Sequence, residues 1–295
     1  MNFRQRFISM RIFQIFLALA ALFALAACGG GGGSGGFSSG AGLFNYAPNV
    51  ADSGTDTSLA SISDDGISGI LSQADIGATS VSSRLRSVKV RISADGNTAF
   101  LTVDGVTQTM PVVIKQPGGG QFGSVPSNVL QVTGSNANHV LMTYSGTSGA
   151  SGFGGFGYVG IESPTARLPT SDASYSGSWG GQAYHPGNSF ANSGVVLGNM
   201  DVTLNFQTGS AAGSFTGNLN AADTGSFSGT ISGNTSGNGA AGTMTINSSG
   251  FSGAMPFAGK TFGFNAEDFA GGFAGSMTAD GSGRTYSMTG TFSLN

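Results

Sequence analysis

The stretch FTGNLNAADTGSFSGTI, residues 215–231, contains the pattern that predicts the fold of this chain. Phe215, Gly217 and Leu219 alternate with small polar residues, and the same alternation returns from Phe227 to Ile231. A period of two residues places successive side chains on opposite faces of a β-strand. The stretch therefore predicts two strands, each with one face of large apolar side chains and glycine and one face rich in hydroxyl and amide groups.

This pattern extends over the whole C-terminal part of the chain. A Phe-small-Gly unit occurs at 215–217, 227–229, 251–253 and 273–275. Eight segments alternate in this way, at residues 175–181, 202–206, 215–219, 227–231, 244–246, 251–253, 273–277 and 286–292. Eight tilted strands enclose a space that side chains can fill, and closure removes free sheet edges. We predict an eight-stranded antiparallel β-barrel over 169–295, with an inward-facing core that includes Tyr175, Trp179, Phe206, Phe215, Phe227, Phe273 and Phe292.

The chemistry of the two strand faces predicts which kind of barrel this is. A barrel that spans a membrane has an apolar band outside and a polar interior. Here each strand has one apolar face, interrupted by glycine, and one face of Ser, Thr, Asn or Gly. We therefore expect a soluble barrel whose interior is apolar.

Residues 45–168 predict a smaller β-rich domain. Val88, Val90 and Ile92 share one face of a strand, and turns at 95–97 and 104–105 predict a three-stranded meander that ends near Ile114. Further short strands are predicted at 129–132, 139–144 and 156–161. Residues 45–83 show no clear alternation, and a loop or short helix is expected there.

Four basic residues lie close together in this domain, at Arg84, Arg86, Lys89 and Arg91. They could form a patch for an acidic ligand. Charges of this kind more often solvate the outer face of a strand, and we expect that role here.

The N-terminus predicts export. Arg4, Arg6 and Arg11 are followed by the apolar stretch 12–25 and then by Leu25-Ala26-Ala27-Cys28. This order is typical of a signal peptide and resembles the lipobox of bacterial lipoproteins, in which the cysteine is lipidated and the chain is cut before it. A transmembrane anchor is the alternative, but the uncharged stretch is shorter than the roughly 20 residues that such a helix needs. We expect a signal peptide at 1–27 and lipidation of Cys28.

Residues 28–44 comprise the lipidated cysteine and a flexible Gly/Ser tether. The residue after Cys28 is Gly29 rather than Asp. By analogy with Gram-negative lipoproteins, the missing retention signal favours anchoring in the outer membrane.

Composition excludes some functional classes. Only 8% of the 295 residues are charged and 52 are glycine, but 22 Phe and 6 Tyr provide burial that a disordered chain lacks. Removal of residues 1–27 takes away three arginines and no acidic residue, which leaves 8 basic and 14 acidic residues and a net charge of −6. Binding of nucleic acid is not expected at this charge. Cys28 is the only cysteine, so no disulfide can form.

Little in the sequence favours catalysis. Gly-x-Ser-x-Gly matches lie only in the tether, so no catalytic residues and no enzyme activity are expected. Neither histidine has a partner at metal-ligand spacing, so no structural metal is expected. His139 begins an apolar strand and is either an ordinary strand-edge residue or an axial ligand of haem, the one cofactor that we consider. His185 follows the first strand of the barrel and is either a turn residue or a ligand-binding residue.

Residues 171–295 resemble the C-terminal barrel of the transferrin-binding protein B-like lipoproteins. The resemblance lies in YSGSWGG at 175–181, in the Phe-small-Gly strands, and in FGFNAED at 262–268. Its most specific part is the loop motif made by Asn265, Ala266, Glu267, Gly271 and Gly272. Phe264 departs from the family, in which proline is common at this position.

The resemblance implies a surface lipoprotein of a Gram-negative bacterium, with a β-rich handle domain before the barrel. Members of the family capture transferrin, haem, haem-carrying proteins or complement regulators, and some need a translocator that recognises the barrel. We therefore expect an outer-membrane-anchored protein that binds a ligand in iron or haem acquisition, with haem or a host iron-carrier protein as ligand and an outer-membrane receptor as partner. The alternative is a lipoprotein for adhesion, immune evasion or surface coating, without a role in iron uptake.

Overall fold

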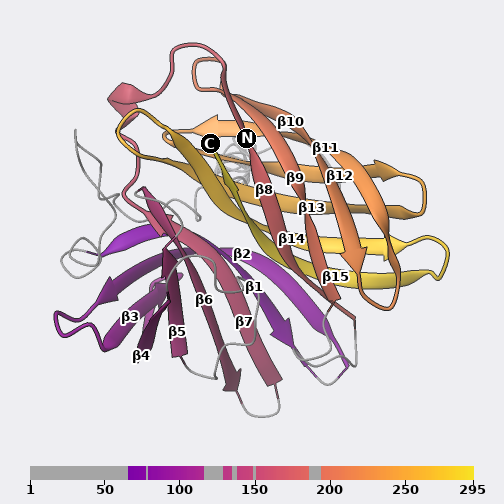
Figure 1. Ribbon diagram of the computed structural model, residues 1–295, viewed down its shortest axis with the longest axis horizontal. Helices are drawn as coiled ribbons and strands as arrows, with labels where there is room; N and C mark the ends of the chain where they lie inside the picture. Colours follow the sequence, from indigo (N-terminus) through magenta and orange to yellow (C-terminus); the bar gives the residue numbers. More distant parts are fainter. Residues whose placement is uncertain (1–65, 78, 116–128, 135–137, 149–150, 186–193) are drawn as a thin grey trace, which may run out of the picture. The chain divides into compact units, whose positions relative to one another are not determined.

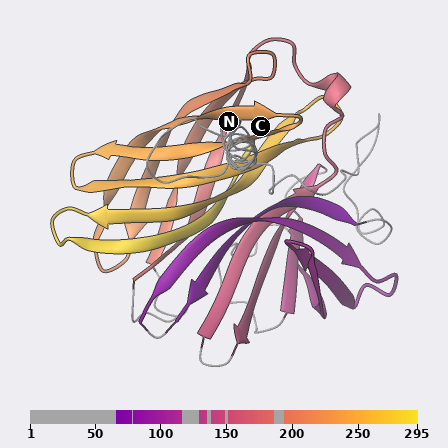
Figure 2. The ribbon, with the colours of Figure 1, turned by 180° about the vertical axis from the view of Figure 1, so that it is seen from behind.

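The chain folds into two closed β-barrels in the part that the structure describes (Figures 1 and 2). The computed structural model describes residues 66–77, 79–115, 129–134, 138–148, 151–185 and 194–295. These residues form strands β1 to β15 and one 3₁₀ turn at Thr165–Arg167, and they contain no α-helix. The all-β fold class that the sequence predicts is confirmed.

The C-terminal barrel consists of eight antiparallel strands. These are β8 (Ala173–Tyr184), β9 (Gly194–Asn205), β10 (Ser210–Asn220), β11 (Thr224–Ser236), β12 (Gly239–Ser248), β13 (Phe251–Phe262), β14 (Asp268–Ala279) and β15 (Arg284–Leu294). Each strand pairs with the next in the chain, and β15 pairs with β8 to close the barrel. All eight predicted strands are present, and the predicted closure is confirmed.

Aromatic rings fill this barrel because glycines on neighbouring strands make room for them. The Trp179 ring meets the rings of Phe215 and Phe273 edge to face, with centroids 5.8 and 5.1 Å apart. A Cβ atom on Gly217 would lie 2.6 Å from Cζ2 of Trp179 and 2.7 Å from Cζ of Phe227. A side chain at Gly217 would collide with these rings, and a Cβ atom on Gly229 would lie 2.5 Å from the Phe215 ring. At Gly253 and Gly275, the other two glycines of the Phe-small-Gly repeat, the backbone of the neighbouring strand comes too close for a side chain.

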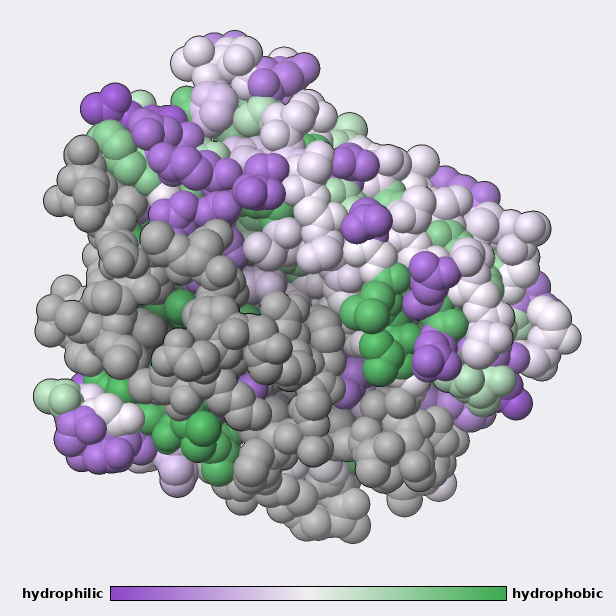
Figure 3. Space-filling view, in the orientation of Figure 1, coloured by the Kyte–Doolittle hydropathy of each residue, from purple (hydrophilic) through white to green (hydrophobic). Residues whose placement is uncertain are grey.

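The outer face of the same strands is covered by small polar side chains. On β11, exposed Ser226, Ser228 and Thr230 alternate with buried Phe227 and Ile231. The face of the molecule in Figure 3 shows the effect: over the C-terminal barrel most residues have intermediate hydropathy, and strongly hydrophilic ones are scattered among them. The surface of this barrel therefore contacts water mainly through hydroxyl and amide groups, and charged side chains are sparse on it.

The N-terminal barrel consists of seven strands. These are β1 (Ile67–Ile76), β2 (Val81–Ile92), β3 (Thr98–Val103), β4 (Val106–Lys115), β5 (Val129–Gly134), β6 (His139–Ser148) and β7 (Ser151–Gly160). The predicted meander is confirmed as β2–β3–β4. The barrel closes because β1 pairs with both β2 and β7, while β4 and β5 pair in parallel. Its core is mostly aliphatic and includes Leu71, Val88, Val90 and Leu101.

The prediction of a loop or short helix before residue 83 is wrong for β1. Both faces of this strand are buried, so its sequence shows no alternation between apolar and polar residues. Ile67 and Leu71 point into the N-terminal barrel, whereas Ile70 packs against Ala258 and Ala274 of the C-terminal barrel. Residues 45–65 of the same prediction lie outside the described residues.

Polar contacts join the outer faces of the two barrels. Ser72 donates a hydrogen bond of 2.5 Å to the carbonyl oxygen of Phe273 and accepts one of 3.2 Å from the Gly290 N–H. Glu162, just after β7, forms a buried ion pair with Lys260 of β13. The Glu162 carboxylate also accepts hydrogen bonds from Ser68, at 2.5 Å, and Asn238, at 2.9 Å. Because these partners satisfy the carboxylate, the charge can be buried.

Candidate functional site

The predicted lipid anchor lies outside the described residues. This holds for the signal peptide at 1–27, for Cys28 and for the tether at 28–44. Within the described residues, no helix is long and hydrophobic enough to cross a membrane. Lipidation of Cys28 thus stays a prediction.

Most of the aromatic residues predicted for the core lie inside the C-terminal barrel. The buried ones are Tyr175, Trp179, Phe215, Phe227, Phe273 and Phe292. Phe206 differs, because it lies one residue beyond the end of β9, where it is only partly buried and packs against the edge of the core. These side chains fill the barrel and leave its interior to packing rather than to a ligand.

The loop motif between β13 and β14 is held by its own side chains. The Glu267 carboxylate accepts hydrogen bonds from the backbone N–H and the side-chain amide of Asn265, at 2.9 and 3.1 Å. Ala266 has a positive φ of 57°, and its carbonyl oxygen accepts a hydrogen bond of 2.9 Å from the Tyr175 hydroxyl. Burial, with smaller effects from Asp268 and Glu267, raises the pKa of Tyr175 to about 12. The motif thus fixes a tight turn against the first strand of the barrel.

The remaining motif residues act in packing. A Cβ atom on Gly271 would lie 2.1 Å from the carbonyl oxygen of Ala258, and one on Gly272 would lie 3.2 Å from Cβ of Ser72. Phe264 packs against the core of the N-terminal barrel. The Arg167 guanidinium lies 4.7 Å from its ring centroid.

His139 is completely buried at the start of β6. Its Nε2 lies 2.9 Å from the Ser293 hydroxyl oxygen, and its ring packs edge-on against Tyr158, with centroids 4.9 Å apart. The ring of Phe262 lies 5.4 Å away on a tilted plane. Burial lowers the pKa of His139 to about 4. A ligand as large as haem can reach this imidazole only if the packing around it opens.

His185 lies at the end of β8, at the rim of the C-terminal barrel, and is partly exposed. Its Nδ1 lies 2.9 Å from the carbonyl oxygen of Thr285. A carbonyl can only accept, so Nδ1 carries the proton and donates this hydrogen bond. In the neutral ring, the lone pair then lies on Nε2, as in histidines whose second nitrogen binds a metal.

A hydrogen-bonded cluster lies beside His185 at the same rim. The Tyr286 ring, 5.9 Å from the His185 ring, donates through its hydroxyl to the Asp223 carboxylate at 2.7 Å. Arg284 donates to the same carboxylate at 2.8 Å. The pKa of Asp223 is lowered first by the hydrogen bond from Tyr286 and also by that from Arg284. This rim network ties three turns of the barrel together.

The basic group of β2 divides between two faces, which corrects the expectation that all four residues solvate the outer face. Arg86 lies opposite Leu71 in the ladder, and Arg84 lies opposite Gln73, so both project on the inner face of the N-terminal barrel. Lys89 and Arg91 lie on the other face. Arg84 pairs with Asp75 at 2.6 Å, and Arg86 pairs with Asp104 at 2.7 Å.

These arginines belong to a polar layer that closes one end of the N-terminal barrel. We call it the mouth and define it as Gln73, Asp75, Arg84, Arg86, Asp104 and Tyr144. The buried Tyr144 hydroxyl donates to the Gln73 side chain at 2.5 Å, and Gln73 donates to Asp75 at 2.6 Å. Burial raises the pKa of Tyr144. The mouth was not predicted from the sequence, although Arg84 and Arg86 have the same parity as Val88, which shares its face of the strand with Val90 and Ile92.

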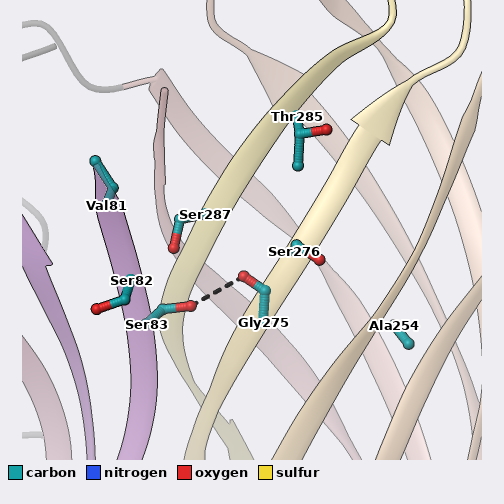
Figure 4. A pocket seen from close by; sticks show the side chains of 8 residues that line it. All are labelled: Val81, Ser82, Ser83, Ala254, Gly275, Ser276, Thr285 and Ser287. Atoms are coloured by element: carbon teal, nitrogen blue, oxygen red, sulfur yellow. Dashed lines mark hydrogen bonds between the residues drawn. The ribbon is translucent and has the colours of Figure 1, made fainter. Parts of the chain in front are cut away.

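An open groove of about 380 Å³ lies between β2 and strands β13 to β15 (Figure 4). It is lined by Val81, Ser82, Ser83, Ala254, Gly275, Ser276, Thr285 and Ser287. Ser83 donates a hydrogen bond of 2.9 Å to the carbonyl oxygen of Gly275, drawn as a dashed line in Figure 4. The lining contains no charged or aromatic side chain, so the groove has little chemistry for recognising a ligand.

No group of three or more His, Cys, Asp or Glu side chains that could hold a metal ion occurs among the residues that the structure describes. The chemically distinctive places in the described part are therefore the mouth of the N-terminal barrel and the rim around His185.

Comparison with known proteins finds similarity to solved structures. No protein-family model matches the chain, and no curated protein matches it. The chain is similar to two crystal structures of the vaccine antigen transferrin binding protein B from Haemophilus parasuis Hp5. A double mutant is 16% identical with a TM-score of 0.34, and a single mutant is 15% identical with a TM-score of 0.38. In both cases 77% of this chain is covered, and it spans 45% of the other chain.

Proposed function

We propose that this protein is a lipoprotein of the outer membrane that captures a ligand in iron or haem acquisition. The lipobox-like end at Cys28 supports the anchor, and the resemblance of residues 171–295 to transferrin-binding protein B-like lipoproteins supports ligand capture. The packed core of the C-terminal barrel leaves its rims and loops for binding. A binding protein fits this architecture, and no enzyme activity is proposed.

The observation that carries the haem arm of the proposal is the hydrogen bond from His185 to Thr285. It holds the imidazole in the tautomer that leaves Nε2 as an electron-pair donor, and the residue is partly exposed. His139 has no such access, because it is buried against Ser293, Tyr158 and Phe262. Of the two histidines, His185 is thus the proposed axial ligand.

A titration with hemin tests this arm. We use the full chain, purified in detergent, and follow the Soret band. The band is expected to shift and sharpen on binding, and His185→Ala should abolish the change. His139→Gln, which keeps a polar side chain in the buried position, should leave it intact. A Soret change that survives His185→Ala would contradict the assignment of His185.

Capture of a protein ligand is tested separately, with host serum. The full chain immobilised on beads is expected to retain an iron-carrier protein such as transferrin or a haem carrier. If neither hemin nor an iron carrier binds, the role in iron uptake is wrong and the alternative of adhesion, immune evasion or surface coating replaces it.

Fractionation of cells that produce the protein tests the lipid anchor. Cys28→Ser should release the protein from the outer membrane, and retention of this variant would contradict lipidation.

A further inference from the structure

Each barrel has a network of tyrosine, arginine and aspartate side chains at one end. The network of the N-terminal barrel differs in that one arginine N–H donor has no acceptor in the part of the chain that the structure describes. At the rim of the C-terminal barrel, Tyr286, Arg284 and Asp223 pair with one another. At the mouth of the N-terminal barrel, the buried Tyr144 packs against the apolar core and the Phe153 ring, and arginine and aspartate side chains pair with each other there. The mouth holds two arginines instead of one, and Nε of Arg86 is buried with no hydrogen-bond partner among the described residues.

The unpaired Nε lies on the edge of the guanidinium that grips an oxyanion. Asp104 takes its hydrogen bond from Nη1 of Arg86, at 2.7 Å. The edge formed by Nε and Nη2 is the one that binds carboxylate or phosphate through two parallel hydrogen bonds. A buried donor without an acceptor is costly, so an acceptor atom supplied by a ligand would be favoured here.

The surroundings of Arg86 suit a small ligand. Its side chain is 18% exposed, and the Arg84 side chain, two residues along the same face, is 53% exposed. Arg84 pairs with Asp75, which is linked through Gln73 to the Tyr144 hydroxyl, and Arg86 pairs with Asp104. Two positive and two negative charges therefore meet at this end of the barrel, and the Nε edge of Arg86 is left as a donor without an acceptor among the described residues.

We propose that the mouth of the N-terminal barrel binds a small oxyanion, a carboxylate or a phosphate, through the Nε edge of Arg86 with Arg84 as a second cation. From the sequence alone, all four basic residues of β2 could form a patch for an acidic ligand. The proposed site uses only the two that project into the barrel, Arg84 and Arg86. It goes beyond the proposed iron or haem capture and does not depend on it, because no residue of the mouth takes part in that proposal.

Calorimetric titration of the full chain in detergent tests the site, with citrate as the carboxylate probe and pyrophosphate as the phosphate probe. Sodium chloride at matched ionic strength controls for screening. Binding of at least one probe is expected, and which one binds identifies the chemistry. Arg86→Gln should weaken it by about tenfold or more, as expected for loss of hydrogen bonds between charged groups. Arg86→Lys, which keeps the charge but lacks the Nε edge, should weaken it as well.

Lys89→Gln is the matched control, since it removes one positive charge from the same strand on the opposite face. It should leave the affinity within about twofold, because a surface charge outside the site is largely screened by salt. If Arg86→Gln does not fold, Arg84→Gln replaces it, since that side chain is the more exposed one. Failure of both probes to bind the unmodified protein, or equal affinities of the Arg86 and Lys89 variants, would overturn the proposal.

Discussion

The two closed barrels differ in what fills their cores. Edge-to-face rings such as Trp179 and Phe273 occupy the C-terminal barrel, and glycines such as Gly217 lie where the rings need space. The N-terminal barrel is filled mainly by aliphatic side chains such as Leu71 and Val88. Phenylalanine and glycine recur at fixed spacing in the strands of the C-terminal barrel, whereas the aliphatic core of the N-terminal barrel has no such repeat. Closure was therefore predictable for the C-terminal barrel and not for the N-terminal one.

The largest expected effect comes from removing the central ring. Trp179→Ala should lower the free energy of unfolding by about 3–5 kcal/mol, because a large buried side chain is lost and a cavity remains. Denaturant titration followed by circular dichroism measures this, since the variant lacks the only tryptophan. A decrease in the unfolding free energy of less than about 1 kcal/mol would contradict the placement of Trp179 in the core.

Gly217→Ala then tests whether ring and glycine are coupled. Its Cβ clashes with Trp179 in the unmodified protein, so its cost should be smaller in the Trp179→Ala background. The same Gly217→Ala change in a Leu71→Ala background, which alters the other barrel, should show simple additivity. Additivity in both backgrounds would contradict the ring-and-glycine explanation.

A second large effect is expected at the contact between the barrels. Lys260→Met leaves the buried Glu162 carboxylate without its cation and should cost about 3–5 kcal/mol of unfolding free energy. The double variant Lys260→Met with Glu162→Gln should recover part of this loss, because no uncompensated charge remains. Arg84→Gln, which breaks an exposed ion pair, should cost less than about 1 kcal/mol. Equal costs for the single and double variants would show that the charge is not buried in solution.

Buried His139 predicts a pH dependence of the unfolding free energy. Because the pKa of His139 in the folded protein, about 4, lies below the ordinary histidine value of 6.5, the unfolded chain binds the proton more readily. Stability is therefore complete above about pH 6.5 and falls as the pH drops toward 4, by about 3 kcal/mol in total. His139→Gln should flatten the curve of unfolding free energy between pH 6.5 and 4. An unchanged slope in His139→Gln would assign the dependence to carboxylates.

The smallest effect concerns two residues with positive φ, one in each half of the fold. Ala266→Gly should raise the unfolding free energy by up to about 1 kcal/mol, because glycine adopts a φ of 57° without steric cost. Asp104→Gly relieves a φ of 48° but also loses the ion pair with Arg86, so its gain should be smaller. Thermal unfolding of both variants checks the order, and a larger gain from Asp104→Gly would reverse it.

Much of the C-terminal barrel could be predicted from the sequence, because alternation reports directly on strands with one buried face. β1 could not, since Ile67 and Ile70 are buried on opposite faces and erase the alternation. The parallel pairing of β4 with β5 could not be predicted either, because the sequence of each strand carries no information on the direction of its neighbour. Closure of the N-terminal barrel depends on both features.

The candidate sites were only partly predictable for a similar reason. The sequence identifies His185 as a possible ligand because it is a histidine. Its tautomer, however, is fixed by the carbonyl of Thr285, which is 100 residues away in the chain. Arg84 and Arg86 were recognised as basic residues, but their direction follows from the ladder with β1, a strand that the pattern concealed. Parity with Val88 was the available signal, and it outweighs the general tendency of charged residues to face solvent.

The position of β1 has a mechanical consequence. In the chain this strand follows the segment that contains Cys28, and it is hydrogen-bonded along both edges, to β2 and to β7. If Cys28 carries the lipid, as proposed, a pull from the membrane passes along the chain to β1. Two hydrogen-bonded ladders and two packed faces of this strand then share the load.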